Sequence, residues 1–298
     1  MDPHWDDLRV FLCVAREESL SGAGKRLMMD PATVGRRIAR LEAAIEAALF
    51  LKSPQGYLLT AAGERLLGHA EEAERAMRAG VEALSGPDDS LAGQIRIGAP
   101  DGCANYVLSR VCSRVARANV DLDIQIVALP RVVNLNRREA DMAITVSPPT
   151  AGQFHVEKIT DYKLHIVGAR PYLRARPAIE TIADLRAHRF IGYIPDMIYD
   201  AELDYLRDLE LDRLALASNS VLVQLRLAAQ GDGLCVAHDF ALSAHPDLCK
   251  VLPDQISLTR SFYLVRHKSD LRSDRLTRMS EIIRSELRDE VARLEAEA

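Results

Sequence analysis

The sequence predicts a protein of the α/β class in which a small helical region precedes a longer region of mixed strands and helices. Two observations predict this. Apolar residues recur at helical spacing up to about residue 84, and from Gly93 onward short β-type runs alternate with helical patterns, which is typical of a parallel sheet covered by helices. The length of 298 residues exceeds one typical domain, so we expect two or three units.

The composition excludes several classes of protein. Hydrophobic residues are 48% and charged residues 27%, as in ordinary soluble globular proteins. The N-terminus lacks a basic stretch followed by an apolar core, so we expect no signal peptide. No apolar run approaches the ~18 residues that span a bilayer. These features predict a cytoplasmic protein without a membrane partner.

The cysteines predict neither disulfides nor a metal site. Their number is odd and their spacing wide, and neither CxxC nor a zinc-type His/Cys cluster occurs. Because free cysteines are usually buried, we expect packed thiols and no metal or cofactor. The five are Cys13, Cys103, Cys112, Cys235 and Cys249.

Two short helices are expected at the start of the chain. Asp6 or Asp7 can cap the first, which ends at Glu17-Glu18, and Ser19 can cap the second. Each helix has one apolar face, formed by Leu8, Phe11, Leu12 and Ala15 in the first and by Leu20, Ala23 and Leu27 in the second.

A third helix is predicted over residues 30–45. Asp30 is a good N-cap, and Pro31 suits the first helical position because its missing N–H has no partner there anyway. The buried stripe is predicted to be Val34, Ile38, Leu41 and Ile45. At ~100° per residue, another face collects Thr33, Arg36, Arg37 and Arg40.

The charge distribution indicates what this basic face binds. The formal net charge of −5 argues against nucleic acid as a partner. However, residues 25–40 hold five basic side chains against only Asp30, and screening removes charges beyond ~8–10 Å. The helix therefore suits the major groove of double-stranded DNA. The alternative is a solvated surface helix, because Arg-rich faces are common.

A hairpin, or wing, is predicted after the third helix. Residues 49–51 and 57–59 are apolar and flank the turn signal Pro54-Gln55-Gly56. Lys52 sits beside this turn, where it can reach a phosphate.

Residues 5–67 resemble the winged helix-turn-helix of LysR-type transcriptional regulators. The matching strings are LRVFLCVAREESLSGAGKRL, ATVGRRIARLEAAI, ALF and LTAAGERLL, at the spacing of that family. Pro31 replaces a usual base-reading Gln, Ala48 and Leu51 replace a usual Arg and an acidic residue, and Lys52 replaces a usual Arg. The resemblance implies a DNA-binding domain over 1–60, with contacts from Ala32, Thr33, Arg36, Arg37, Arg40 and Lys52.

A long helix is expected from Thr60 to about Leu84. Its apolar positions follow spacings close to a coiled-coil seam: Leu66, Ala70, Ala73, Met77, Val81 and Leu84. The seam favours pairing with a second copy over packing on its own chain. The resemblance implies that residues 61–90 form a dimerisation linker and hinge, broken at 85–90, and that the assembly is a homo-dimer or homo-tetramer.

The remaining region is predicted to form the α/β part. Strands are expected at 94–100, 123–129, 141–147, 163–169, 189–194, 214–218, 234–238 and 260–267, and helices at 105–118, 132–140, 221–230 and 273–288. The resemblance implies that 91–298 is an effector-binding domain of two α/β subdomains like a periplasmic binding protein. The chain would cross between them near Thr160 and Leu264.

A small-molecule site is expected at the carboxyl ends of these strands, where helix N-termini offer free amides. Asn219-Ser220 before a helix is such a place. Each residue taken singly is also explained by turn or cap chemistry. The candidate set is Asp101, Gly102, Arg131, Ser147, Tyr193, Asn219 and Ser220, and with both Asp101 and Arg131 the charge of the effector stays open.

No enzyme motif stands out. GAPDG at 98–102 lacks the GxGxxG spacing, and Cys235 with His238-Asp239 resembles a nucleophile cluster by composition alone. We therefore predict a ligand-responsive transcriptional regulator that binds a palindromic operator, with RNA polymerase as a further partner to test. The alternatives are a solute-binding protein, which would not need residues 1–60, and an architectural DNA binder without an effector.

Overall fold

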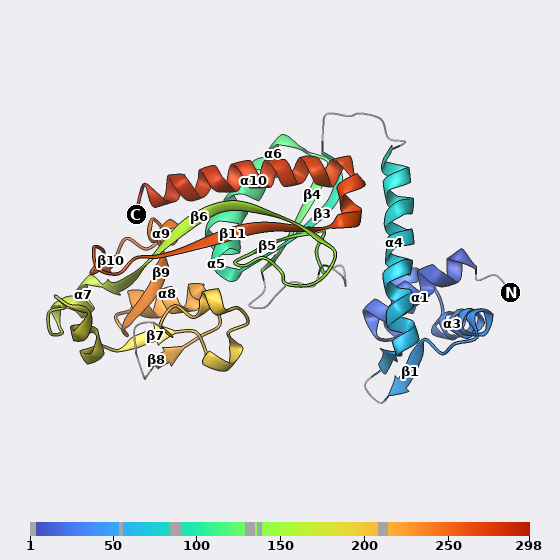
Figure 1. Cartoon of the computed structure of the whole chain (residues 1–298), viewed down its shortest axis with the longest axis horizontal. Helices are drawn as coiled ribbons and strands as arrows, with labels where there is room; N and C mark the ends of the chain where they lie inside the picture. Colours follow the sequence, from blue (N-terminus) through green and yellow to red (C-terminus); the bar gives the residue numbers. More distant parts are fainter. Residues whose placement is uncertain (1–3, 54–55, 84–90, 129–134, 136–138, 208–213) are drawn as a thin grey trace. The chain divides into compact units, whose positions relative to one another are not determined.

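The computed structural model describes residues 4–53, 56–83, 91–128, 135, 139–207 and 214–298. The chain forms two compact units, Met1–Asp88 and Asp89–Ala298, which are described separately (Figure 1). Among the described residues, no helix has the length and the apolar character needed to cross a bilayer.

The N-terminal unit is a winged helix-turn-helix followed by a long helix, as the sequence predicts. Its elements are α1 (Trp5–Glu17), α2 (Leu20–Leu27), α3 (Pro31–Ile45), β1 (Phe50–Ser53), β2 (Gly56–Leu59) and α4 (Ala61–Ala83). Two of the predicted caps are present, because the side chain of Ser19 accepts from the N–H of Gly22 and that of Asp30 accepts from the N–H of Ala32. The predicted cap of the first helix is wrong: α1 begins after His4, and Asp6 and Asp7 lie inside its first turn.

Two local contacts fix the geometry of this unit. A Cβ on Gly24 would lie 2.7 Å from the carbonyl oxygen of Met29, so only glycine fits where α2 turns toward α3. At the far end of α3, Glu42 Oε1 accepts from the N–H groups of Leu49 (2.7 Å) and Phe50 (3.2 Å). The carboxylate thereby joins the helix to the first strand of the wing.

In the described part of the C-terminal unit, nine strands form one sheet. Its strands are β3 (Gly93–Ala99), β4 (Leu122–Ala128), β5 (Met142–Thr145), β6 (Phe154–Ala169), β7 (Phe190–Gly192), β8 (Leu214–Ala217), β9 (Leu234–His238), β10 (Leu248–Val251) and β11 (Leu258–His267). The order is β4-β3-β5-β11-β6-β9-β7-β8, and β10 also pairs with β6. The predicted parallel run is confirmed for β3, β4 and β5. The sequence analysis did not predict β10.

The helices of this unit are α5 (Asp101–Cys103), a π-helical turn η1 (Ala104–Leu108), α6 (Ser109–Ala118), α7 (Arg170–Arg174), α8 (Val221–Ala229), α9 (Asp239–Leu242) and α10 (Asp274–Glu295), with 3-10 turns η2 (Ile182–Ala187), η3 (Pro195–Met197), η4 (Ala201–Leu203) and η6 (Lys268–Arg272). The helix predicted over 105–118 corresponds to α5, η1 and α6, which follow one another without a break. It begins at Asp101, four residues earlier than predicted. Most of the predicted helix at 132–140 lies outside the described residues.

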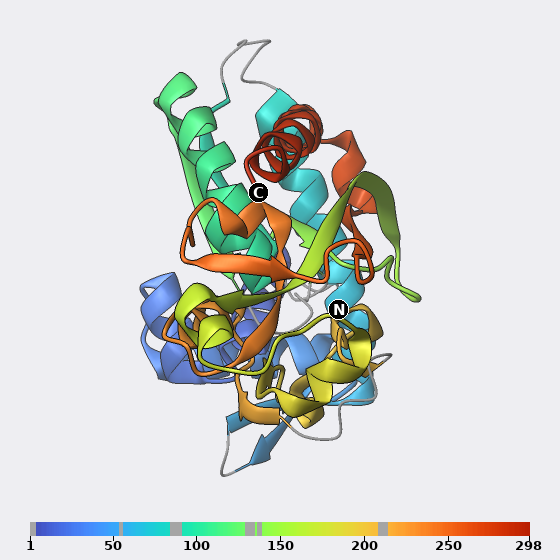
Figure 2. The same cartoon turned by 90° about the vertical axis from the view of Figure 1, so that its left-hand side faces the viewer.

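Strands β6 and β11 join the two halves of this unit. We call β3–β5 with α5, η1, α6 and α10 the first half, and β7–β10 with α7–α9 the second half. β11 pairs with β5 and β6, whereas the end of β6 pairs with β9 and β10. Near the predicted crossings, Thr160 pairs with Phe262 and the register shifts at Phe262/Tyr263. Helix α10 lies along β6 (Figure 1) and is seen nearly end-on in Figure 2.

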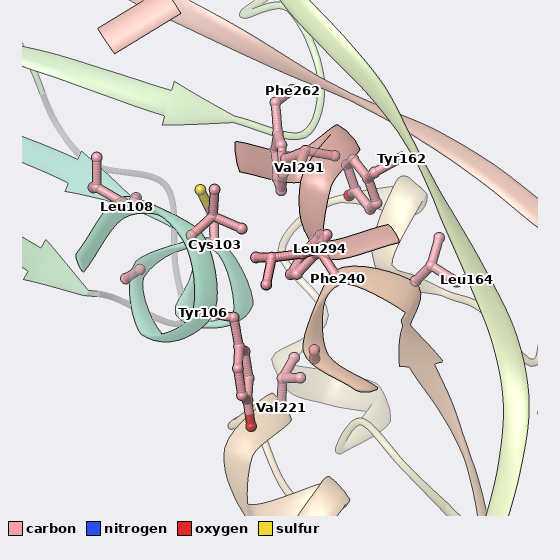
Figure 3. Packing of buried hydrophobic residues seen from close by; sticks show 14 of the residues in the cluster. Cys103, Tyr106, Leu108, Tyr162, Leu164, Val221, Phe240, Phe262, Val291 and Leu294 are labelled. Carbon is pink, nitrogen blue, oxygen red and sulfur yellow. The ribbon is translucent and has the colours of Figure 1, made fainter. Parts of the chain in front are cut away.

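One large hydrophobic core runs through both halves, beside a smaller cluster of Leu135, Ala140, Ala143 and Val265. Figure 3 shows side chains from η1, β6, α8, α9, β11 and α10 contributing to it. At its centre Tyr162 is 1% exposed and stacks on Phe262, with ring centroids 4.2 Å apart. The crossing strands are therefore packed into the core, and the two halves share it.

Candidate functional site

The predicted basic face lies on the outside of α3. Val34, Ile38 and Leu41 are buried, as the apolar stripe predicts. Ala32, Arg36 and Arg40 are exposed, while Thr33 and Arg37 are half-buried. Arg36 Nη2 donates to Thr33 Oγ1 at 3.1 Å. These five predicted residues do share one side of the helix.

Two of the three arginines on this face contact acidic residues of α1. Arg40 Nε and Nη2 donate to Asp7 Oδ2 and Oδ1 at 2.6 and 2.5 Å, and the hydrogen bond to Asp7 raises the pKa of Arg40. Arg37 Nη1 lies 3.9 Å from Asp6 Oδ2 and 3.8 Å from Asp7 Oδ1. The net charge of residues 25–40 does not include these partners, because Asp6 and Asp7 lie earlier in the sequence.

Two further basic residues differ in the same respect: Arg26 is paired with a carboxylate, whereas Lys52 has no such partner among the described residues. Arg26 Nη1 pairs with Glu17 Oε1 at 2.9 Å. Lys52 is exposed in the wing, with its Nζ 6.0 Å from the ring centroid of Tyr57. Among the predicted DNA contacts that the structure describes, Arg36 and Lys52 are the cations without a carboxylate partner.

The outer face of the wing is apolar. Leu51 and Leu58 are directly opposite one another on β1 and β2 and are 59% and 45% exposed. Because Leu51 stands where the resembling family usually has an acidic residue, the wing surface is uncharged at this position. Lys52 is the one cation of β1.

The predicted seam of α4 has two parts. Leu66 and Ala70 pack on the core of their own unit, and Arg16 Nη2 on α1 is 2.9 Å from Glu74 Oε2. This matches packing on the same chain rather than on a partner. Met77, in contrast, is 75% exposed. The side chains of Val81 and Leu84 lie outside the described residues.

Two predicted effector residues bind one another at the start of α8. Asp101 Oδ2 accepts from Ser220 Oγ at 3.0 Å and from the N–H of Leu222 at 3.4 Å. Ser220 also caps the helix by accepting from the N–H of Val223 at 3.5 Å. The expected free helix N-terminus is thus already occupied by a carboxylate from the first half.

Three further contacts join the two halves at this edge of the sheet. Ser147 Oγ donates to Asp200 Oδ2. Tyr106 Oη and His245 Nε2 are 2.8 Å apart. A Cβ on Gly102 would lie 3.1 Å from Cε1 of His238, so glycine permits this approach. Of the predicted effector residues, Ser147 and Gly102 therefore lie against residues of the second half that were not in the predicted set, Asp200 and His238.

Two pockets lie beside these contacts. One, of about 890 Å³, is lined mainly by the segment after β7 and includes Tyr193; the other, of about 530 Å³, includes Ser147. Tyr199 and Asp200 line both pockets. Asp101, Gly102, Asn219 and Ser220 line neither, and Arg131 lies outside the described residues.

Sequence reasoning missed the segment that forms the larger pocket. The sequence predicts a strand over residues 189–194, but β7 ends at Gly192. The chain then continues through short 3-10 turns at Pro195–Met197 and Ala201–Leu203. These turns bring Tyr199, Asp200, Asp204 and Tyr205 to the pocket. The one signal in the sequence is the clustering of aromatic and acidic residues between 193 and 205.

The suspected nucleophile cluster is not a cluster in the fold. His238 is buried among Tyr162, Tyr205 and Phe240, and burial lowers its pKa to about 4. Asp239 instead contacts His165 Nδ1 (2.7 Å) and Lys250 Nζ (2.9 Å). Burial raises the pKa of Cys235 to about 12, so no thiolate is present at neutral pH. All five cysteines are free thiols, as predicted.

Both units match models of known protein families. Residues 5–64 match the "bacterial regulatory helix-turn-helix protein, lysR family", and residues 88–288 match the "LysR substrate binding domain". The second match covers more than half of the chain.

Curated relatives and solved structures agree with these matches. The transcriptional regulator BbuR of Bordetella bronchiseptica is 28% identical over 298 residues, covering 95% of this chain and 90% of BbuR. PtxR of Pseudomonas aeruginosa is 23% identical, covering 83% and 81%. Full-length OxyR of Pseudomonas aeruginosa matches the fold with a TM-score of 0.74 at 16% identity, covering 97% and 95%. LysG of Corynebacterium glutamicum, with bound effector arginine, matches with a TM-score of 0.66 at 18% identity, covering 96% and 98%.

Proposed function

The chain belongs to the LysR family of bacterial transcriptional regulators, and from this premise we propose how its residues divide the work. It is a DNA-binding regulator with an effector-binding domain and not an enzyme. The proposal assigns DNA binding to residues 1–60, pairing of copies to 61–90 and effector sensing to 91–298. The exposed basic face of α3 carries this proposal.

Helix α3 enters the major groove of the operator, with Arg36 as the principal base-reading or phosphate-binding side chain. Arg36 is exposed and has no carboxylate partner among the described residues. One of its N–H groups donates to Thr33 Oγ1, and its other donors can reach guanine or phosphate. Ala32 and Thr33 face the DNA beside it, and Lys52 contacts the backbone. Arg37 and Arg40 contribute less to DNA affinity, because both already face acidic groups. Part of the effect of Arg40 is indirect, since its ion pair with Asp7 holds α3 in place.

Two copies bind one operator. Met77, exposed on α4, supports a contact between copies. Recognition helices related by a two-fold axis require a palindromic site with half-sites about one helical turn apart or a multiple of it. The homo-dimer is the minimal unit, and a tetramer would pair two of them. Contact with RNA polymerase would then carry the response.

The C-terminal unit senses a small molecule at the pockets that share Tyr199 and Asp200. The ligand acts by favouring one arrangement of the two halves, because only a difference in affinity between two states can shift their populations. Of the predicted residues, Ser147 and Tyr193 line these pockets, while Asp101, Gly102 and Ser220 lie at the contact between the halves. That LysG holds arginine as its effector supports a small-molecule ligand here.

The experiment is a gel-shift titration on a DNA fragment identified by genome-wide mapping of binding sites. Arg36→Ala should weaken binding. If Arg36 reads guanine, preference at one base pair should relax by ~1–3 kcal/mol; if it binds phosphate, affinity should fall evenly and the salt dependence should flatten. Arg174→Ala, which removes an exposed charge from the C-terminal unit, is the control. Wild-type affinity in both Arg36→Ala and Arg37→Ala would refute the groove assignment.

A further inference from the structure

Aromatic and acidic side chains line the larger pocket. Of its described lining residues, three are tyrosines and two are aspartates: Tyr193, Tyr199, Tyr205, Asp200 and Asp204. Its volume of about 890 Å³ is in the range of pockets that bind small molecules. All five come from the segment between β7 and β8, so the second half alone supplies these polar and aromatic groups.

The described lining residues carry a net negative charge, and the nearby Arg260, whose charge acts on Tyr205, is paired with Glu202. Among the described lining residues Arg207 is the one cation, and it is exposed. Burial first, and then the carboxylates of Asp200 and Asp101, raise the pKa of Tyr199 to about 12. Burial, the neighbouring tyrosines and Asp101 also raise the pKa of Tyr193. Burial disfavours a charge of either sign, whereas the neighbouring carboxylates of Asp200 and Asp101 disfavour a negative charge specifically.

The usual place for an anion in this type of sheet is already taken. The first amides of a helix after a parallel strand attract carboxylates and phosphates. Here the N–H of Leu222 and the hydroxyl of Ser220 both donate to Asp101. An anionic ligand would have to displace a carboxylate that is part of the chain. A cation displaces no carboxylate: Asp200 and Asp204 line the pocket, and Asp200 also accepts from Ser147 Oγ and from the N–H of Glu202.

We propose that this pocket binds a small molecule carrying a protonated amine, with the ammonium group against Asp200 and the tyrosines around it. A carboxylate forms a short charge-assisted hydrogen bond with an ammonium group, and aromatic rings attract cations through their electron-rich faces. This inference rests on the proposed function, because it names the chemical class of the effector.

Asp200 also connects the ligand to the movement of the halves. Its Oδ2 accepts from Ser147 Oγ of the first half, and its Oδ1 accepts from the N–H of Glu202. An ammonium group at the same carboxylate changes the strength of the Ser147 contact. Binding in the second half thereby alters the energy of the contact between the halves, which is what a population shift requires.

The first test compares two ligands of equal chain length and opposite charge. The full-length protein is heated with 1,4-diaminobutane or with succinate, and binding is measured by calorimetry. We expect the diamine to raise the melting temperature by a few degrees at concentrations well above its Kd, because it binds the folded state only. Succinate should have no effect. Stabilisation by succinate alone, by both ligands equally or by neither overturns the proposal.

The second test uses matched variants in the same segment. Asp200→Asn should weaken diamine binding by about tenfold or more, since it removes a charge-assisted hydrogen bond. Asp196→Asn is the control, because Asp196 is exposed in the same segment and does not line the pocket. Tyr199→Leu should also weaken binding while Tyr199→Phe, which keeps the ring, should retain it. Equal affinities for Asp200→Asn and Asp196→Asn would show non-specific attraction to an acidic protein and overturn the proposal.

The outcome separates this inference from the proposed function. A protein that binds its operator but not the diamine keeps its place as a regulator and loses only the assigned effector class. A protein that binds the diamine but no DNA fragment would contradict the proposed function and leave the pocket assignment intact.

Discussion

Asp7 on α1 and Arg40 on α3 form a two-pronged ion pair, with Oδ2–Nε and Oδ1–Nη2 distances of 2.6 and 2.5 Å. Asp7 is 1% exposed, whereas half of the Arg40 side chain is exposed. Arg40 therefore uses its planar donor fork inside the protein, and it holds α3 against the helix that supports it. Its place on the basic face of α3 conceals this structural role.

Arg40→Ala should lower both the melting temperature of the N-terminal unit and its affinity for DNA, because it leaves the buried carboxylate of Asp7 without its partner. Arg36→Ala should lower affinity alone. Thermal unfolding followed by circular dichroism, beside gel-shift titration, distinguishes the two. Adding Asp7→Asn to Arg40→Ala should restore part of the stability, since the buried charge is then removed. A wild-type melting temperature in Arg40→Ala would show that the pair is not structural.

Met77→Glu should weaken the pairing of copies. Met77 is 75% exposed on α4, so the substitution has little effect on the fold of one copy, but it places a charge in an apolar contact between two. Light scattering should show a smaller assembly, and gel shifts should show weaker binding to a two-site operator. His69→Glu is a suitable control, since His69 is a similarly exposed α4 residue outside the proposed seam. An unchanged assembly would place the contact elsewhere.

Ser220→Ala should destabilise the C-terminal unit by about 1 kcal/mol, the usual cost of removing a helix N-cap. The hydroxyl both caps α8 and donates to Asp101, so Asp101→Ala should have a similar effect, and the double variant should cost less than the sum of the two. Chemical denaturation measures all three. If Ser220→Ala kept its stability and its operator binding but no longer responded to the effector in a reporter assay, direct contact of Ser220 with the effector would be supported instead.

The stability of the C-terminal unit should fall as the pH decreases from about 6.5 to about 4. Burial lowers the pKa of His238 from 6.5 to about 4 in the folded chain. In this range the unfolded chain binds a proton that the folded chain does not, so stability is complete above pH 6.5 and decreases below it. The loss over this range is about 3 kcal/mol.

Chemical denaturation at several pH values, in wild type and in His238→Gln, checks this dependence. The variant should lose part of the pH dependence and keep the rest, because burial also lowers the pKa of His188 and of His245. Parallel pH profiles for the two proteins would mean that His238 titrates normally in the folded state.

Much of the N-terminal unit could be predicted because its signals are local. Asp30 and Ser19 cap helices through amides two or three residues away, and the apolar stripe of α3 reflects a helical period that any short window displays. The family resemblance rests on the same sixty residues. The free thiols and most strands of the second unit were also predicted, with β10 the omission.

The prediction of the candidate site was weaker because its contacts are long-range. Asp101 and Ser220 were identified as ligand residues, yet they are 119 positions apart and bind one another. Asp200, which lines both pockets, is 53 positions from the Ser147 that contacts it. No periodicity or cap rule links residues at such distances.

Most helices and strands, and the apolar face of each helix, follow from the sequence, because caps and helical periodicity involve neighbours along the chain. Tertiary structure decided which charged groups remain free. It placed Asp7 on Arg40, Asp101 on the start of α8 and Asp200 on Ser147. The physical reason is that a buried or half-buried charge takes the nearest partner in space, and only the packing of α1 on α3, and of the two halves on each other, brings that partner there.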